Sequence, residues 1–198
     1  MSTLVMNISQ LIAVLRGFFY RLIYVGNLHV DGAILAMQAN SSIEIFNKNA
    51  NVWIGKFVFL RKSVSIRVDS DAELRLGEKV FINDNCTINC AYRITIGAHT
   101  KIAPNVCIND HDHNYKQAGE GHLVKDEVTI GSHVWIGSNA VILKGATIGD
   151  NAVIAAGSIV KGNVPPNTLF VNRRENQYIP YTKADGNETP LPLAKGSI

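Results

Sequence analysis

The chain has 198 residues, of which 46% are hydrophobic and 18% are charged. This is enough apolar material for one domain with a substantial core, and too little charge for a globally disordered chain. The formal net charge is only +3 and the basic residues are scattered, so nucleic-acid binding is not expected.

Residues 1–28 predict an amphipathic helix. Apolar residues recur at helical spacing from Leu4 to Ile23, and Arg16 and Arg21 lie on the other side. No basic region precedes the run and no small-residue cleavage site follows it, so a signal peptide is not expected, and the polar interruptions disfavour a membrane span. We expect the helix to pack on the body or on a neighbouring subunit, or to lie on a membrane surface through residues 3–25.

The three cysteines, Cys86, Cys90 and Cys107, are odd in number and form no CxxC pair. A disulfide scaffold and a structural zinc site are therefore disfavoured, and no metal is expected. Free thiols are typical of a reducing environment, so we expect a cytoplasmic protein, either free or peripheral at the inner face of the membrane.

A repeat of six residues runs through the middle of the chain. From residue 130 onward the sequence divides into six consecutive hexads, and the fifth place of each is small or β-branched. The first places are always Ile or Val: Ile130, Ile136, Ile142, Ile148, Ile154 and Val160. The same frame appears upstream, with breaks, in sets that begin at Ile54, Leu76 and Ile96.

Each hexad predicts a short strand followed by a corner. The aliphatic first residue fills the core, and Asn or Gly at corners such as Gly145 and Asn151 accepts left-handed backbone angles. Three hexads make one triangular coil of about 18 residues, and such coils stack in parallel. We therefore expect a β-solenoid over residues 29–168, capped by residues 1–28 and by a C-terminal cap and tail over residues 169–198.

One insertion interrupts the frame. The interval from the set at Ile96 to the set at Ile130 is much longer than the interval from Leu76 to Ile96. The excess matches the stretch that carries no hexad signal, and it predicts an extruded loop over residues 114–127. His111 and His113 stand at the edge of this loop, where a regular coil has no structural need for two imidazoles.

The hexads resemble the left-handed parallel β-helix of the hexapeptide-repeat acyltransferases. The resemblance covers residues 43–168 and is closest to the branch with galactoside, maltose and streptogramin acetyltransferases. The Asp-His-x-His run at residues 110–113 is similar to that of the O-antigen O-acetyltransferases. The resemblance to this family implies an all-β, left-handed fold, acetyl-CoA as co-substrate, and a homotrimer with active sites at the subunit interfaces.

The same resemblance implies catalytic roles for the two histidines. Counted from the Ile-Ala-Pro at residues 102–104, the family's catalytic His corresponds to His113, which takes the proton from the acceptor. His111 is an orienting residue, an acceptor contact or a reserve base. Asp110 or Asp112 can hold an imidazole tautomer, and the sequence does not choose between them. No Ser or Cys nucleophile is required, so direct transfer is expected.

For the acceptor, an ungapped alignment back from Ile96 puts the family's binding Asn at Asn83, with Phe81 in place of the family's Tyr. Asp112 is a further candidate acceptor contact. An acceptor-contacting Asp of the family is replaced by Ala91, which predicts an acceptor other than a simple galactoside or maltoside.

For acetyl-CoA, the resemblance implies that the pantetheine arm lies along a groove between two subunits. The corresponding residues are Trp135, Gly137, Ser138 and Ala156. At the nucleotide end the chain departs from the family. Lys161 is displaced by one position, and Arg173 and Arg174 replace the usual element as candidate phosphate contacts.

These patterns predict an acetyl-CoA-dependent O-acetyltransferase that acts on a sugar hydroxyl of a surface polysaccharide or its precursor. An N-acetyltransferase of an amino-sugar nucleotide or an antibiotic-like acceptor is the nearest alternative. Two alternatives of other classes are a non-catalytic β-helix scaffold and a zinc carbonic anhydrase on the same fold. The anhydrase needs three converging His ligands, for which the candidates are His99, His111, His113, His122 and His133.

Overall fold

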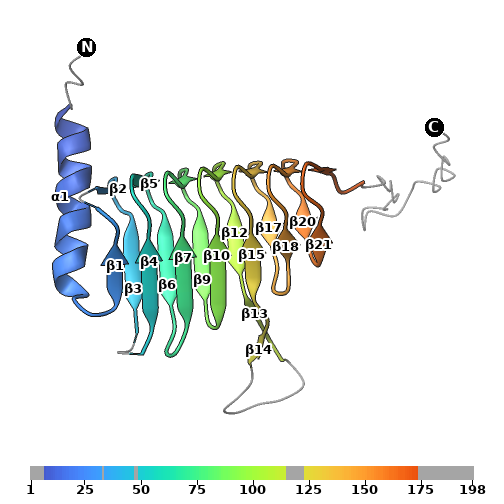
Figure 1. Cartoon of the computed structure of the whole chain (residues 1–198), viewed down its shortest axis with the longest axis horizontal. Coiled ribbons are helices and arrows are strands. Elements are labelled where there is room, and N and C mark those ends of the chain that lie inside the picture. Colours follow the sequence, from blue (N-terminus) through green and yellow to red (C-terminus); the bar gives the residue numbers. More distant parts are fainter. Residues whose placement is uncertain (1–6, 33, 47–48, 115–122, 174–198) are drawn as a thin grey trace, which may run out of the picture.

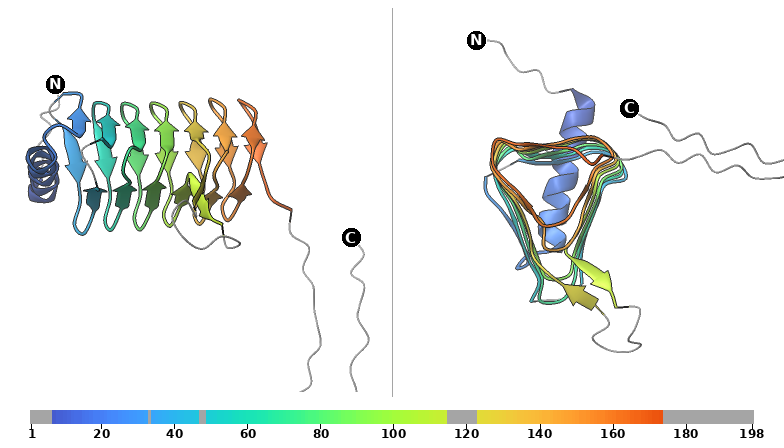
Figure 2. Two further views of the ribbon diagram at one scale, coloured as in Figure 1. Left: turned by 90° about the horizontal axis from the view of Figure 1, so that it is seen from below. Right: turned by 90° about the vertical axis from the view of Figure 1, so that its right-hand side faces the viewer.

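The computed structural model of the chain is a triangular solenoid with one helix at its N-terminal end (Figure 1). It describes residues 7–32, 34–46, 49–114 and 123–173. Seen along its axis, the chain winds through about six turns around three flat faces (Figure 2). This architecture confirms the expected all-β fold and matches a left-handed β-helix.

Each face of the solenoid is a parallel sheet with one strand per coil. Sheet A contains β1 (Leu28–Val30), β4 (Asn51–Ile54), β7 (Glu73–Leu76), β10 (Arg93–Ile96), β15 (Val128–Ile130), β18 (Thr147–Ile148) and β21 (Asn163–Val164). Sheet B contains β2 (Leu35–Met37), β5 (Val58–Leu60), β8 (Phe81–Ile82), β11 (Lys101–Ile102), β16 (Trp135–Ile136), β19 (Val153–Ile154) and β22 (Leu169–Phe170). Sheet C contains β3 (Ser42–Ile45), β6 (Ser65–Val68), β9 (Thr87–Cys90), β12 (Cys107–Asn109), β17 (Val141–Ile142) and β20 (Ile159–Val160).

The hexad frame explains the core. Residues at the first place of successive coils pair in register, so that Ile96 lies beside Ile130 and Ile130 beside Ile148. These side chains point inward and are buried, as are the small residues at the fifth place, such as Ala140 and Ala152. Because every coil contributes the same inward residues, the core is one continuous column.

The corners follow the expected chemistry of left-handed backbone. Gly145 and Asn151 have φ angles of 75° and 57°, and many of the other corner residues with positive φ are Asn. His99 and His133 also occupy such corners, with φ angles of 60° and 58°. At Gly97 the neighbouring coils approach too closely for any side chain. A Cβ there would lie 2.5 Å from the Gly131 carbonyl carbon.

Within the described residues, the chain leaves the solenoid after β12, the sheet C strand of the fourth coil. β13 (His111–His113) pairs antiparallel with β14 (Leu123–Lys125), and this two-stranded stem projects from one edge of the triangle (Figure 2). His113 lies opposite Leu123, and His111 lies opposite Lys125. The histidines that the sequence placed at the root of a loop therefore belong to a paired strand.

The helix α1 (Ile8–Ile23) lies across the N-terminal end of the solenoid (Figure 1). It begins with a capping box, in which Asn7 and Gln10 each accept a hydrogen bond from the other's backbone N–H. Its buried residues are the small Ala13 and Gly17. In the part of the chain that the structure describes, no helix is long and apolar enough to cross a bilayer.

Candidate active site

The centre of the histidine site is a buried carboxylate. Asp110 follows β12 directly and is wholly inaccessible to solvent. Its two oxygens accept hydrogen bonds of 2.8 Å from the backbone N–H groups of Ala91 and Tyr92, which form the corner of the preceding coil. A charged group buried in this way requires such partners, because leaving it unpaired would cost several kcal/mol. Asp110 therefore joins the stem to the coil beneath it.

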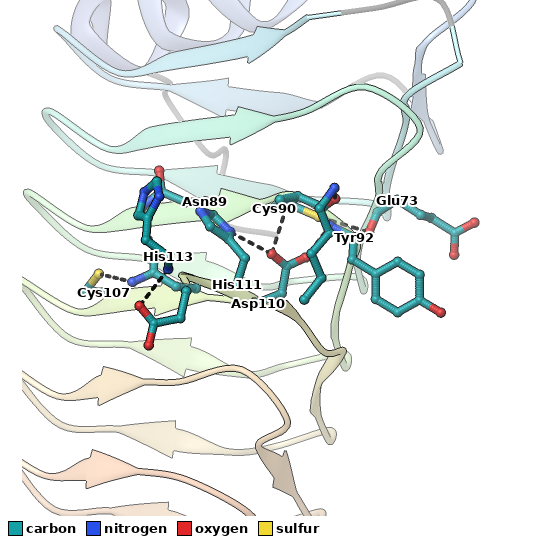
Figure 3. A network of polar contacts seen from close by, with 12 residues as sticks. Glu73, Asn89, Cys90, Tyr92, Cys107, Asp110, His111 and His113 are labelled. Atoms are coloured by element: carbon teal, nitrogen blue, oxygen red, sulfur yellow. Dashed lines mark hydrogen bonds and ion pairs between the residues drawn. The ribbon is translucent and has the colours of Figure 1, made fainter. Parts of the chain in front are cut away.

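Asp110 also holds one imidazole. Its Oδ1 lies 3.0 Å from His111 Nδ1 (Figure 3). A proton on Nδ1 completes this hydrogen bond, which leaves Nε2 as the acceptor nitrogen. The sequence left open whether Asp110 or Asp112 would orient an imidazole, and the geometry assigns this contact to Asp110.

His113 lies two residues further along β13. Residues two apart in a strand share a face, and the rings of His111 and His113 meet edge to face with centroids 6.5 Å apart (Figure 3). His113 is exposed, whereas His111 is only partly accessible. The exposed Asp112 accepts a hydrogen bond from the backbone N–H of His113.

Two asparagines beside the histidines were not predicted from the sequence. Asn89 on β9 donates to Asn109 on β12 at 2.8 Å, and Asn109 donates to the sulfur of Cys107 at 3.3 Å. Both asparagines stand on the outer face of sheet C, where they pair in register, and Asn89 lies next to His113 (Figure 3). The sequence does contain a pattern that could have identified them, because each is a polar residue at an outward strand position upstream of the histidines.

The stem is tied to the solenoid on its other side as well. Lys125, opposite His111 on β14, donates from Nζ to the carbonyl of Ala91 at 2.8 Å. The backbone N–H of Asp126 donates to the carbonyl of Asp110 at 2.8 Å. Both strands of the stem are therefore fixed to the same coil corner, so the imidazoles stand on a rigid base.

The predicted acceptor residues lie elsewhere on the chain. Asn83 is at the corner between sheets B and C, where its side-chain oxygen accepts from the backbone N–H of Asp84. Phe81 is on sheet B and stacks on Phe59 with ring centroids 5.7 Å apart. Because His111 follows the sheet C strands and Asn83 precedes them, a single chain holds these residues at opposite edges of sheet C.

The predicted pantetheine residues form one group on sheet B and its following corner. Trp135 points outward and is 47% exposed. Gly137 packs directly on the next coil, since a Cβ there would lie 2.6 Å from the backbone nitrogen of Ala156. The carbonyl of Ser138 accepts from the N–H of Gly157 at 2.8 Å, so this carbonyl already forms a hydrogen bond between neighbouring coils.

An open hollow accompanies this group. It measures about 420 Å³ and is lined by His99, Lys101, His133, Val134 and Trp135. The rings of His99 and His133 stack with centroids 4.8 Å apart. A larger open hollow of about 490 Å³ lies on sheet A around Trp53 and includes none of the predicted site residues.

The candidate phosphate contacts lie near the C-terminal end of the solenoid. Lys161 follows β20 and Arg173 follows β22, and both are exposed. Arg174 lies outside the described residues, as does His122. Among the described residues, no three His, Cys, Asp or Glu side chains are grouped as metal ligands would be.

Comparison with known proteins agrees with this fold. The family described as bacterial transferase hexapeptide (six repeats) matches residues 127–162. The galactoside O-acetyltransferase of Escherichia coli (strain K12) is 42% identical over 100 residues, which cover 50% of this chain and 49% of that protein. The protein of that strain named for O-acetyl transfer in lipopolysaccharide biosynthesis, WbbJ, is 33% identical over 120 residues, covering 54% and 61%.

Among solved structures, a hexapeptide-repeat-containing acetyltransferase from Vibrio cholerae is 27% identical with a TM-score of 0.51, and the match covers 79% of this chain and 74% of that one. The chain spans about half the length of the galactoside enzyme that it matches. The hexads, the fold and the relatives agree on a β-helix domain built from hexapeptide repeats. Over residues 127–162 the chain matches the hexapeptide-repeat transferase family, and its fold is similar to that of a solved hexapeptide-repeat acetyltransferase.

Proposed function

We propose that the protein is an acetyl-CoA-dependent O-acetyltransferase whose acceptor is a sugar hydroxyl of a surface polysaccharide or its precursor. The observation that carries the proposal is the stem β13–β14, which presents two imidazoles on a rigid base where the chain departs from the solenoid. Support comes from relatives that are named for O-acetyl transfer to a galactoside and in lipopolysaccharide biosynthesis.

In the proposed reaction His113 is the general base. Its exposed imidazole accepts the proton of the acceptor hydroxyl as that oxygen attacks the thioester carbonyl. The new C–O bond forms, the C–S bond breaks, and the CoA thiolate takes the proton back from the imidazolium. His111 is the orienting neighbour, because its own ring is held by Asp110 and meets the His113 ring at its edge.

The donor would be held by the group around Trp135. The exposed indole offers an apolar surface for the pantetheine arm, and the adjacent hollow has room for it. Lys161 and Arg173 are exposed cations toward the end of the solenoid, where they can meet the nucleotide phosphates together with Arg174.

The active site would be shared between copies of the chain. His113 follows the sheet C strands, whereas Trp135 lies on sheet B, so one side of the triangle separates them, which is roughly 15–20 Å at a rise of roughly 3.3 Å per residue. Within one chain, acetyl-CoA that is bound at Trp135 would therefore hold its thioester too far from His113 for the reaction. A closed homotrimer, in which sheet B of one copy faces the stem of the next, brings the donor group and the base together.

The first experiment is calorimetric titration of the purified protein with acetyl-CoA in the absence of acceptor. Micromolar binding at one molecule per chain is expected, and no binding up to millimolar concentration would refute the proposal. Matched hydroxyl and amine acceptors then follow, and reaction with the amine alone would identify an N-acetyltransferase instead.

The assignment of the base is tested by substitution. The variant His113→Ala should lose at least about a hundredfold in turnover while its affinity for acetyl-CoA changes little. His111→Ala is the comparison variant, because it removes the neighbouring imidazole from the same strand, and it should lose less turnover than His113→Ala. If His111→Ala abolishes turnover and His113→Ala does not, the base is His111.

A further inference from the structure

The helix α1 is attached to the protein by its small residues. Ala13 and Gly17 face the solenoid, and Gly17 approaches so closely that a Cβ there would collide with the carbonyl of Leu35. Arg16 and Arg21 reinforce this contact by donating to the carbonyls of Met37 and Gly32 at 2.8 and 3.0 Å. In most amphipathic helices the large apolar residues face the core, and here they do not.

The large apolar residues of α1 point away from the protein. At 100° per residue they occupy about 140° of the helix surface, on the side opposite Ala13 and Gly17. Each is between 45% and 78% exposed: Ile8, Leu11, Ile12, Leu15, Phe18, Phe19, Leu22 and Ile23. We call these eight residues the outer face of α1. Their exposed area is roughly 800 Å², above the 300–600 Å² of the largest apolar patch on a typical monomer.

We propose that the outer face of α1 docks the protein on the surface of an anionic lipid bilayer. The helix lies across the end of the solenoid rather than along one of its three sheets (Figure 1). Copies that pack side by side with parallel axes would therefore present their α1 helices on one common plane. The outer face is also broader than the narrow seam through which two helices pair.

The charges of the helix favour an anionic bilayer over a second copy of the chain as the partner of the outer face. Arg16 and Arg21 are the charged residues of Ile8–Ile23, and there is no acid among them. Both guanidinium groups lie on the flanks, on the side of the solenoid, which is where headgroups would lie if the outer face entered the acyl boundary. A second α1 that packed on the outer face would offer no carboxylate to these guanidinium groups, whereas an anionic headgroup beside the flanks would meet them with the opposite charge.

The test is co-sedimentation of the full chain with vesicles of phosphatidylcholine alone and of phosphatidylcholine mixed with phosphatidylglycerol. Binding to the anionic vesicles is expected, with weaker binding to the neutral ones and a decline as salt is raised. Phe19→Gln should weaken the partition about fivefold or more, and Leu15→Gln with Phe19→Gln should abolish it.

Phe57→Gln is the matched control, since Phe57 is 55% exposed against 59% for Phe19 and lies on a corner of the solenoid. It should bind like the unmodified protein, and far-UV circular dichroism should show that all variants keep the fold. Absence of binding to anionic vesicles, or binding that the α1 variants leave unchanged, would overturn the proposal. A loss of oligomer size in Phe19→Gln without vesicle binding by the parent protein would assign the outer face to a second copy.

Discussion

Replacing Asp110 with Asn removes one charge from the centre of the histidine site without changing its size. The best placement of the amide keeps an oxygen toward Ala91 N–H and His111 Nδ1, and turns its NH2 group toward the N–H of Tyr92. One charge-assisted hydrogen bond is then lost, a donor faces a donor in a fully buried place, and the two remaining bonds become neutral. Together these changes should destabilise the fold by about 2–4 kcal/mol.

The assay is denaturant unfolding followed by circular dichroism at fixed protein concentration, because oligomerisation would otherwise shift the midpoint. Asp112→Asn is the matched control. It lies on the same strand, is exposed, and accepts a hydrogen bond from the N–H of the next residue, so its effect on unfolding should stay within about 0.5 kcal/mol. If Asp110→Asn costs no more than Asp112→Asn, the buried carboxylate does not fix the stem and the argument is wrong.

Two further predictions concern groups away from the histidines. Burial raises the pKa of the Cys86 and Cys90 thiols, so a thiol reagent should modify only the partly exposed Cys107 in the native protein and all three after denaturation. Modification of Cys86 or Cys90 before unfolding would contradict the packing. The hydrogen bond from Arg61 holds the pKa of Asp84 below its usual 3.8, so its stabilisation is present above that value and is lost as the pH falls through the lowered one. Arg61→Ala should therefore cost at most about 1 kcal/mol near neutral pH, since the pair is partly exposed, and this difference should vanish in acid. Urea unfolding across pH measures it, and a difference that grows in acid would exclude this pair as its source.

The repeat made the solenoid predictable, because the hexad pattern is local. An inward aliphatic residue every sixth position and a corner that tolerates left-handed backbone each depend on a few neighbouring residues, and Ile130, Ile148 and Asn151 behave as expected. The outward direction of Trp135 followed from the same frame. The long interval between Ile96 and Ile130 likewise located the departure from the solenoid, although not the strands of its stem.

The role of Asp110 was not accessible in this way. Its backbone partners, Ala91 and Tyr92, belong to the preceding coil and meet it only because one coil stacks on the next. From the sequence alone, Asp110 and Asp112 are equivalent neighbours of two histidines. Burial separates them, since one is enclosed between coils and the other stands on the outer side of the stem.

The class of fold and the position of the insertion could be predicted from the sequence alone, because both depend on local periodicity. The contacts between coils were needed to show which carboxylate holds His111, which side of α1 faces the solenoid, and that Trp135 and His113 lie on different sides of the triangle. Each of these depends on contacts between residues of different coils, and no local pattern encodes the side on which such residues meet.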